Sequence, residues 1–274
     1  MVRDSRPRPP LDNASGRIMI DRISATQRPD ERPIGYQVWT NLLFVHWRIP
    51  AEIVAPLLPK SLTLDTWDGD ALIGLVPFYM SGVRPWWSPA VPGISTFCET
   101  NVRTYVHHEG RDPGVWFFSL EAAQSLAVRI ARWRWHLPYF RARMILRREG
   151  DHVSYASHRL WPAPRGVGMT AEIDVGPLLG HDMANRDLPP GRAMPGTLEH
   201  FLVERYILFS ADQHGNLLRG QVHHVPYPVR TAKVVSLTET LLPALGITSN
   251  SDPCHVAFSD GVRVEVFPLR RVEI

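Results

Sequence analysis

From Gln37 onward the chain is built from short apolar and aromatic runs that proline and glycine interrupt. The runs are 41–49, 71–83, 97–107, 114–121, 141–149, 152–160, 172–178, 204–211 and 217–227. Runs of this length, rich in valine, isoleucine and aromatic residues and bounded by turn residues, are typical of β-strands. We therefore expect a mainly β fold, a β-rich α+β chain that closes or stacks as an antiparallel barrel or sandwich.

Only a few segments are expected to be helical. We predict a short helix at 49–59, a helix at 120–133 with Ser119 as its N-cap, and a late helix at 235–246 that ends at Gly246. The segment 255–269 is expected to form a hairpin with Asp260 and Gly261 in its turn.

The first 33 residues differ in composition from the rest of the chain. They mix Arg, Asp, Pro and Ser with few aromatics, and such a composition buries too little apolar surface to offset chain entropy. We expect residues 1–33 to be a disordered tail rich in Arg, Pro and Asp, and residues 34–274 to form a single domain. The N-terminus lacks the apolar stretch of a secretory signal, and no run reaches the roughly 18 apolar residues of a membrane-spanning helix. A cytoplasmic location is therefore expected.

Basic residues slightly outnumber acidic ones, 30 to 27, for a net charge of +3. Arginines gather between 129 and 148, so an RNA-binding or membrane-surface role stays one alternative. A solvent-facing strand surface explains the alternation of Arg141 and Arg143 with apolar residues better, and we expect neither nucleic acid nor membrane as a partner. The lysines are Lys60 and Lys233, which leaves two candidates for chemistry that needs a lysine amine.

The sequence contains no local motif for metal, nucleotide or serine-nucleophile chemistry. Cys98 and Cys254 stand far apart without zinc-ligand spacing, and the histidine pairs 107–108 and 223–224 would point to opposite faces of a strand. The HExxH, GxSxG, Walker A and GxGxxG sequences are absent. A long-range histidine set such as 46, 136 and 224 stays open, but we predict no metal site and no cofactor.

The segment FCETNVRTYV, residues 97–106, carries the most informative polar pattern. In a strand, Glu99, Asn101 and Arg103 share one face, because successive side chains alternate between the two faces. A carboxylate and a guanidinium on a buried apolar face are costly without partners, so these side chains either meet water or line a polar pocket. The spacing alone leaves both alternatives open.

Several segments, in chain order, resemble the domain-of-unknown-function family DUF2071, whose members are similar in fold to acetoacetate decarboxylase. They are 42–50, 57–85, 97–106, 114–122, 131–144, 155–159, 201–210 and 222–229. The resemblance implies a barrel-like core of antiparallel strands around a small-molecule cavity, with a few short helices, and a homo-oligomer. It implies no particular activity.

The resemblance also indicates what the cavity has lost. In acetoacetate decarboxylases a Gly-Phe-Pro-Lys-Lys segment carries the lysine that forms a Schiff base. The corresponding stretch here reads His-Leu-Pro-Tyr-Phe, residues 136–140, which puts Tyr139 at the lysine position. A phenol cannot form an imine with a ketone, and neither Lys60 nor Lys233 is placed to substitute. The resemblance therefore implies that Schiff-base decarboxylation is absent.

The same resemblance assigns polar groups to the cavity. The pocket glutamate of the decarboxylases corresponds to Glu99, and a second pocket acid falls near Arg84 by an ungapped count. With Arg103 and Tyr139, these residues suit a carboxylate or another anion, because arginine offers two parallel donors to such a group. Further side chains expected to line or reach the cavity are Trp47, Trp116, Phe118, His46 and His224.

Two functions follow from these expectations. The first is an enzyme of lyase, hydratase or isomerase type, with Glu99 as general acid or base and Tyr139 as proton donor or oxyanion partner. The second is a non-catalytic protein that binds a small, partly apolar organic acid. A strongly shifted pKa at Glu99 inside a closed cavity would favour the enzyme.

Overall fold

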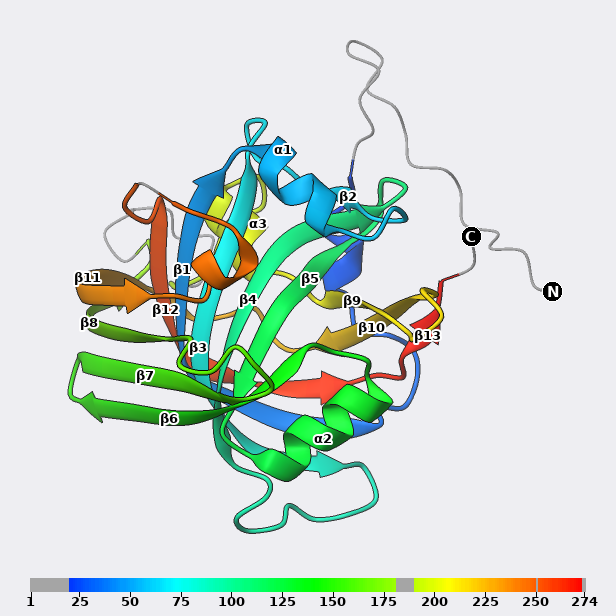
Figure 1. Ribbon diagram of the computed structural model, residues 1–274, viewed down its shortest axis with the longest axis horizontal. Coiled ribbons are helices and arrows are strands. Elements are labelled where there is room, and N and C mark those ends of the chain that lie inside the picture. The colour runs from blue at the N-terminus through cyan, green and yellow to red at the C-terminus, as the bar shows by residue number, and fades with distance from the viewer. Residues whose placement is uncertain (1–19, 181–189, 250, 273–274) are drawn as a thin grey trace.

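A computed structural model describes residues 20–180, 190–249 and 251–272 (Figure 1). Its strands are β1 (Gly35–Ile49), β2 (Thr63–Leu64), β3 (Ala71–Pro85), β4 (Phe97–His108), β5 (Arg111–Ala122), β6 (Tyr139–Glu149), β7 (His152–Trp161), β8 (Gly168–Leu178), β9 (Ile207–Ala211), β10 (Leu217–His223), β11 (Val229–Glu239), β12 (His255–Val266) and β13 (Arg270–Arg271). Its helices are α1 (Ala51–Val54), α2 (Ser125–Arg134) and α3 (Leu198–Val203), with short 3-10 turns η1 (Ser24–Thr26), η2 (Ala55–Leu57) and η3 (Pro243–Leu245). The expected mainly β character is confirmed.

Seven strands close into a ring. Around the ring, each strand pairs with the next in the order β12, β1, β3, β4, β5, β9 and β10, and β10 pairs again with β12. A closed ring leaves none of its members as an unpaired edge and encloses an interior of its own. The strands pair antiparallel, as expected, except at two places, because β5 runs parallel to both β9 and β6.

Four further strands, β6, β7, β8 and β11, continue the sheet from β5 round to β12. Parallel strands cannot be joined by a tight turn, and α2 provides the crossover from β5 to β6. In Figure 1, β6, β7 and β8 lie together at the left of the molecule, away from β9 and β10. A second packed layer therefore stands beside the ring.

The strand β1 is buried on both faces because it lies between these two layers. Leu42 and Phe44 belong to the apolar cluster inside the ring, whereas Leu43 and Val45 belong to the cluster that β7 and β8 complete with residues such as Ile173. A strand covered on both sides reads as a continuous apolar run, which explains the sequence of residues 41–49.

Pairing between strands overrides two of the predicted helix boundaries. The late helix predicted at 235–246 is wrong over most of its length, because β11 continues to Glu239 along β8 and only Pro243–Leu245 turns before Gly246. Ser119 is not a helix cap, because it lies buried within β5 and α2 begins at Ser125. Among the described residues, no helix has the length and hydropathy that crossing a bilayer requires.

The predicted hairpin at 255–269 is also wrong, because β12 is one strand that pairs with β1 on both sides of Gly261. Gly261 has φ 139°, and a Cβ atom there would lie 2.2 Å from the carbonyl oxygen of Trp39. Opposite it, β1 carries Asn41 with φ 51° and an irregular register towards β3. The glycine therefore allows the two strands to bend together where a turn was expected.

The part of the predicted tail that the structure describes packs against the domain. Arg22 forms an ion pair with the buried Asp65, and Nε of Arg28 lies 2.6 Å from Oε2 of Glu265. The guanidinium carbon of Arg32 lies 3.5 Å from the centre of the Trp86 ring. Residues 20–33 thus differ from the expectation of disorder, and residues 1–19 lie outside the described residues.

Replacing Gly261 with alanine is expected to destabilise the protein by at least about 2 kcal/mol, because the added methyl group meets backbone and the φ angle is unfavourable. Gly69→Ala is the matched control, since Gly69 also has a positive φ but nothing lies within 4 Å of its Cβ position. Urea unfolding of both variants measures the difference. An equal loss of unfolding free energy in the two variants would contradict the close approach of β1 and β12.

Candidate functional site

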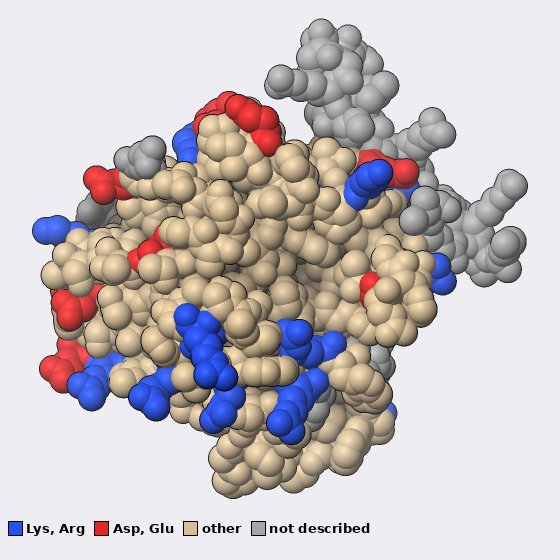
Figure 2. Space-filling view, in the orientation of Figure 1, with Lys and Arg blue, Asp and Glu red and all other residues tan. Residues whose placement is uncertain are grey.

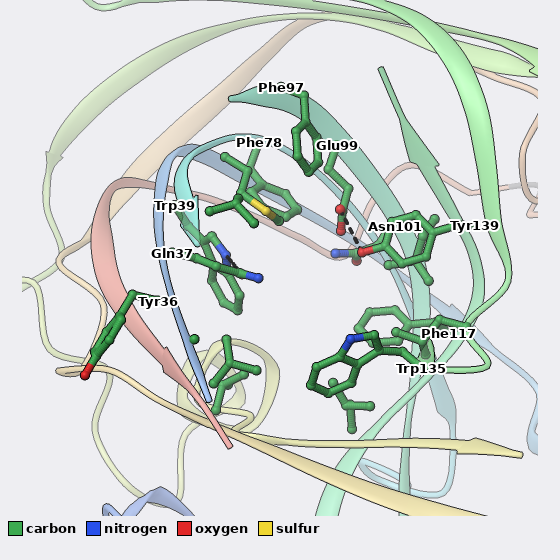
Figure 3. A pocket seen from close by; sticks show the side chains of 18 of the residues that line it. Tyr36, Gln37, Trp39, Phe78, Phe97, Glu99, Asn101, Phe117, Trp135 and Tyr139 are labelled. Carbon is green, nitrogen blue, oxygen red and sulfur yellow. Dashed lines mark hydrogen bonds between the residues drawn. The ribbon is translucent and has the colours of Figure 1, made fainter. Parts of the chain in front are cut away.

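The ring encloses a cavity of about 510 Å³ (Figure 3). Every strand of the ring contributes to its wall, with Trp39 from β1, Phe78 from β3, Glu99 from β4, Phe117 from β5, Leu208 from β9, Val222 from β10 and Val266 from β12. A volume of this size, with mostly apolar walls and few polar groups, is typical of cavities that bind small organic molecules.

The strand β4 supplies a row of polar side chains to this cavity. Glu99, Asn101 and Arg103 line the cavity from alternate positions, as the strand period predicts, and they are 3%, 6% and 8% exposed. Their register partners are Phe78, Val76 and Gly74 on β3, and Ala122, Leu120 and Phe117 on β5. The polar row therefore crosses an otherwise apolar wall.

Glu99 and Tyr139 meet in the cavity. Tyr139, the first residue of β6, donates a hydrogen bond from its Oη to Oε2 of Glu99 over 2.9 Å (Figure 3). Burial raises the pKa of Glu99 to about 8, and the bond from Tyr139 opposes part of that shift. Burial and the adjacent carboxyl group raise the pKa of Tyr139 well above its usual 10. Both groups are therefore protonated near neutral pH.

A buried ion pair holds the start of β6 in place. Nε of Arg159 on β7 donates to both carboxylate oxygens of Glu121 over 3.1 Å, and the guanidinium carbon lies 3.5 Å from the centre of the Phe140 ring. Glu121 pairs with Phe140 across the parallel strands. Because successive side chains point to opposite faces, a contact that anchors Phe140 from outside the ring positions Tyr139 inside it.

Arg103 and Arg205 line the same cavity and meet around the Tyr105 ring. Their guanidinium carbons lie 5.7 Å and 5.1 Å from the centre of that ring. Nη2 of Arg103 donates to the carbonyl oxygen of Leu202 over 3.0 Å, and Nη1 of Arg205 lies 2.9 Å from Oδ2 of Asp65. The cavity thus carries a cationic end and a neutral carboxyl end on one strand.

Arg84 lines the cavity far from this cationic end. It pairs in register with Tyr36 at the start of β1, and its guanidinium carbon lies 4.6 Å from the centre of the Tyr36 ring. Phe78, the register partner of Glu99, is six residues away along β3. The structure therefore does not join Arg84, Arg103 and Glu99 into one constellation.

Three aromatic residues predicted for the cavity do not line it. Trp47 points from β1 into the apolar cluster outside the ring, opposite to the cavity. Trp116 and Phe118 leave β5 on its outer face and line a second hollow with Phe209, and this hollow shares Phe117 and Leu137 with the cavity. Phe117 stands between them and faces the cavity, because a register irregularity between β4 and β5 occurs beside it.

The two predicted histidines pack beside the cavity instead of lining it. His46 is fully buried, with Nε2 2.7 Å from Oη of Tyr105 and Nδ1 3.0 Å from Nδ1 of His255. His224 stacks on Tyr206, with ring centres 4.4 Å apart. Burial lowers the pKa of His46 well below 6.5 and that of His224 to about 4, so both rings are neutral near pH 7.

Several lining residues were not predicted from the sequence, among them Trp39, Trp135 and Arg205. Trp39 lies before the predicted strand, because β1 begins at Gly35 and not at residue 41. Trp135 follows α2 and Arg205 follows α3, in connections whose path depends on the closed ring. Only Trp39 had a local signal, since it continues the run of bulky residues on β1.

The arginines of β6 lie on the surface, as predicted. Arg141, Arg143 and Arg147 are exposed, whereas Ala142 between the first two is buried. Figure 2 shows basic side chains across the lower part of this view of the molecule, where Figure 1 places β6 and α2. None of these arginines lines the cavity.

Comparisons with known proteins agree on one family and one fold. Residues 36–263 match the model of DUF2071, a family described as an uncharacterized conserved protein. The uncharacterized protein YqjF of Bacillus subtilis is 35% identical over 245 residues, which cover 89% of this chain and 94% of YqjF.

Solved structures with a similar fold are distant in sequence. Acetoacetate decarboxylase from Legionella pneumophila has a TM-score of 0.58 at 13% identity, over 91% of this chain and 94% of that one. The enduracididine biosynthesis enzyme MppR, complexed with pyruvate, has a TM-score of 0.60 at 13% identity, over 90% of this chain and 93% of that one. The family match covers most of the chain, so the protein belongs to the DUF2071 family and has an acetoacetate-decarboxylase-like fold.

Proposed function

We propose that the protein binds a small organic acid in the ring cavity and transfers a proton to or from it through Glu99, as a lyase, hydratase or isomerase. The observation that carries this proposal is the bond between Tyr139 and Glu99 inside an apolar cavity. A carboxyl group with a pKa of about 8 is suited to act as a general acid near neutral pH. Perturbed carboxyl groups in cavities are candidates for catalysis on these grounds.

The hydrogen bond gives each residue a distinct part in the transfer. Oε2 of Glu99 accepts from Tyr139, and Oε1 has no hydrogen bond to any described residue, so the proton of the neutral carboxyl group can reside there. When Glu99 donates this proton to a carbonyl or leaving hydroxyl oxygen, a carboxylate remains. A hydroxyl donor bonds more strongly to a carboxylate than to a neutral carboxyl group, so Tyr139 stabilises the charge as it forms.

An imine mechanism needs a lysine amine in the cavity, and this chain has none placed there. The lysines of the sequence, Lys60 and Lys233, are exposed, and neither lines the cavity. Tyr139 occupies the position that the resemblance to the decarboxylases gives to their Schiff-base lysine. The proton transfer proposed here uses side chains of this chain alone.

The proposed ligand class has support from the cavity and from one structural relative. Arg103 and Arg205 give the cavity a cationic end, which suits a carboxylate. MppR, similar in fold, has been solved with pyruvate, a keto acid. The positive charge of this site and the keto acid bound by a protein of similar fold both favour an acidic ligand.

Stability is expected to fall with rising pH because of Glu99. The folded protein keeps this carboxyl group neutral up to a pKa of about 8, whereas the unfolded chain ionises it near 4.5. The unfolded state is therefore stabilised relative to the folded state from about pH 4.5 to about pH 8, and the loss of stability is complete above that range, on the order of 5 kcal/mol.

Unfolding of the wild type and Glu99→Gln, measured from pH 5 to 9, tests this expectation. As pH rises, the unfolding free energy of the wild type should fall relative to that of Glu99→Gln. The effects of the other titrating groups are common to both proteins and cancel in the subtraction. A constant difference would show that Glu99 is ionised in the folded protein, and it would remove the basis for a general acid.

Proton exchange provides a direct test of catalysis. The protein is incubated in D₂O with 2-keto, 3-keto, 3-hydroxy and enoyl carboxylic acids, and deuterium uptake or turnover is followed by NMR. We expect at least one class to react, Glu99→Gln to slow the reaction by about 100-fold or more, and Tyr139→Phe by a smaller factor.

Two results would overturn this proposal. An acid that raises the melting temperature without exchange or turnover would identify a binding protein instead. Covalent trapping of a keto acid on Lys60 or Lys233 after borohydride reduction would restore an imine mechanism.

A further inference from the structure

Arg103 is a buried cation without an acidic partner among the described residues. Arg103 is 8% exposed, Nη2 donates to the carbonyl oxygen of Leu202, and Nε has no hydrogen-bond partner in the described part of the chain. Neutral acceptors do not offset the cost of removing a full charge from water. An anion that enters the cavity would supply the missing charge.

The groups around Arg103 add positive charge that a bound anion would neutralise. Arg205 and Arg22 share the single carboxylate of Asp65, and Nη2 of Arg205 has no hydrogen-bond partner among the residues that the structure describes. One carboxylate therefore serves two guanidinium groups, and Arg103 adds a third positive charge. Without a ligand, the cationic end of the cavity therefore carries a net positive charge.

The distance from this end to Glu99 sets a length for the ligand. Glu99 and Arg103 are four residues apart on β4, and their pairing with β3 is regular. Four residues of strand separate the two Cα atoms by about 13 Å, and side chains that leave the same face of a strand run roughly parallel to one another. A hydrogen bond takes about 3 Å at each end, so a ligand that reaches both groups spans roughly 7 Å or more.

Between the two ends, the strands on either side of β4 present apolar side chains beside Asn101. Its neighbours in register are Val76 and Leu120, and its Oδ1 is buried without a hydrogen-bond partner among the described residues. The cavity of about 510 Å³ is far larger than a three- or four-carbon acid fills. The middle of the ligand is therefore apolar, with room for one hydroxyl or amide donor opposite Asn101.

We infer that the ligand is an elongated carboxylic acid of roughly six to ten carbons, aliphatic or aryl-substituted. Its carboxylate binds at Arg103 and Arg205, and its oxygen-bearing reactive end lies at Glu99 and Tyr139. This inference rests on the proposed function and names the class of acid that the same cavity takes. The length of this ligand distinguishes the chain from enzymes of the same fold that act on short keto acids.

Calorimetric titration of the full chain with linear carboxylates from three to twelve carbons, and with phenyl-substituted acids, tests the length. We expect affinity to rise to a maximum within the range of six to ten carbons and to fall beyond it. The primary amide of the best acid should bind at least about 10-fold more weakly, because a neutral amide loses the charge-assisted hydrogen bonds to the guanidinium.

Three arginine variants locate the carboxylate. Arg103→Met should weaken the best acid by about 10- to 100-fold and abolish the preference for acid over amide. Arg143→Gln, which removes one positive charge from the surface of β6, should leave the affinity unchanged. Arg103→Lys should retain part of the preference, since it keeps the charge but not the guanidinium fork.

The outcomes separate this inference from the proposed function. Short keto acids that bind as tightly as longer acids, or an Arg103→Met variant that binds like the wild type, would overturn the inference even if Glu99-dependent exchange holds. Length-dependent binding that Arg103→Met abolishes would support it, and an absence of exchange with those same acids would then count against the catalytic proposal alone.

Discussion

The structure depends on the closure of a β-ring in which one member, β4, carries a carboxyl group, an amide and a guanidinium on its inner face. Closing β4 between β3 and β5 removes Glu99, Asn101 and Arg103 from water together. The two ends of this row respond differently to burial. Glu99 can give up its charge by keeping a proton, whereas the guanidinium of Arg103 cannot lose one in a protein. The cavity therefore holds a neutral acid at one end and an uncompensated cation at the other.

The shared strands of the two layers make this arrangement stable. The strands β1, β3 and β4 present one face to the cavity and the other to the apolar cluster that β7 and β8 complete. That second cluster fixes the strands without using the cavity side, so the cavity can keep polar groups and open volume. Outside the ring, the Glu121–Arg159 pair and the ring of Phe140 position Tyr139 at its entry into β6.

Sequence reasoning succeeded where the answer depends on local periodicity. The alternation of β4 predicted that Glu99 and Arg103 share a face, and the alternation of β6 predicted an exposed row of arginines.

Sequence reasoning failed where the pairing between strands determines which way a side chain points or where a strand bends. The register irregularity between β4 and β5 turns Phe117 inward, with Trp116 and Phe118 outward, and no local pattern indicates such a shift. Gly261 resembles a turn residue in sequence, but its partner β1 makes it a bend within β12. Arg205 joins the cavity through a connection that only the closed ring brings there.

Each role given to Glu99 requires that its carboxyl group is neutral in the folded protein, and a titration of the carboxyl carbon measures that state. The ligand-free protein is labelled with ¹³C at glutamate side-chain carboxyl groups, and the Glu99 signal is assigned by its absence from Glu99→Gln. We expect a midpoint near a pKa of about 8, well above the usual 4.5. A midpoint near 4.5 would show a carboxylate at neutral pH, and it would contradict both the buried neutral acid and the acid catalysis built on it.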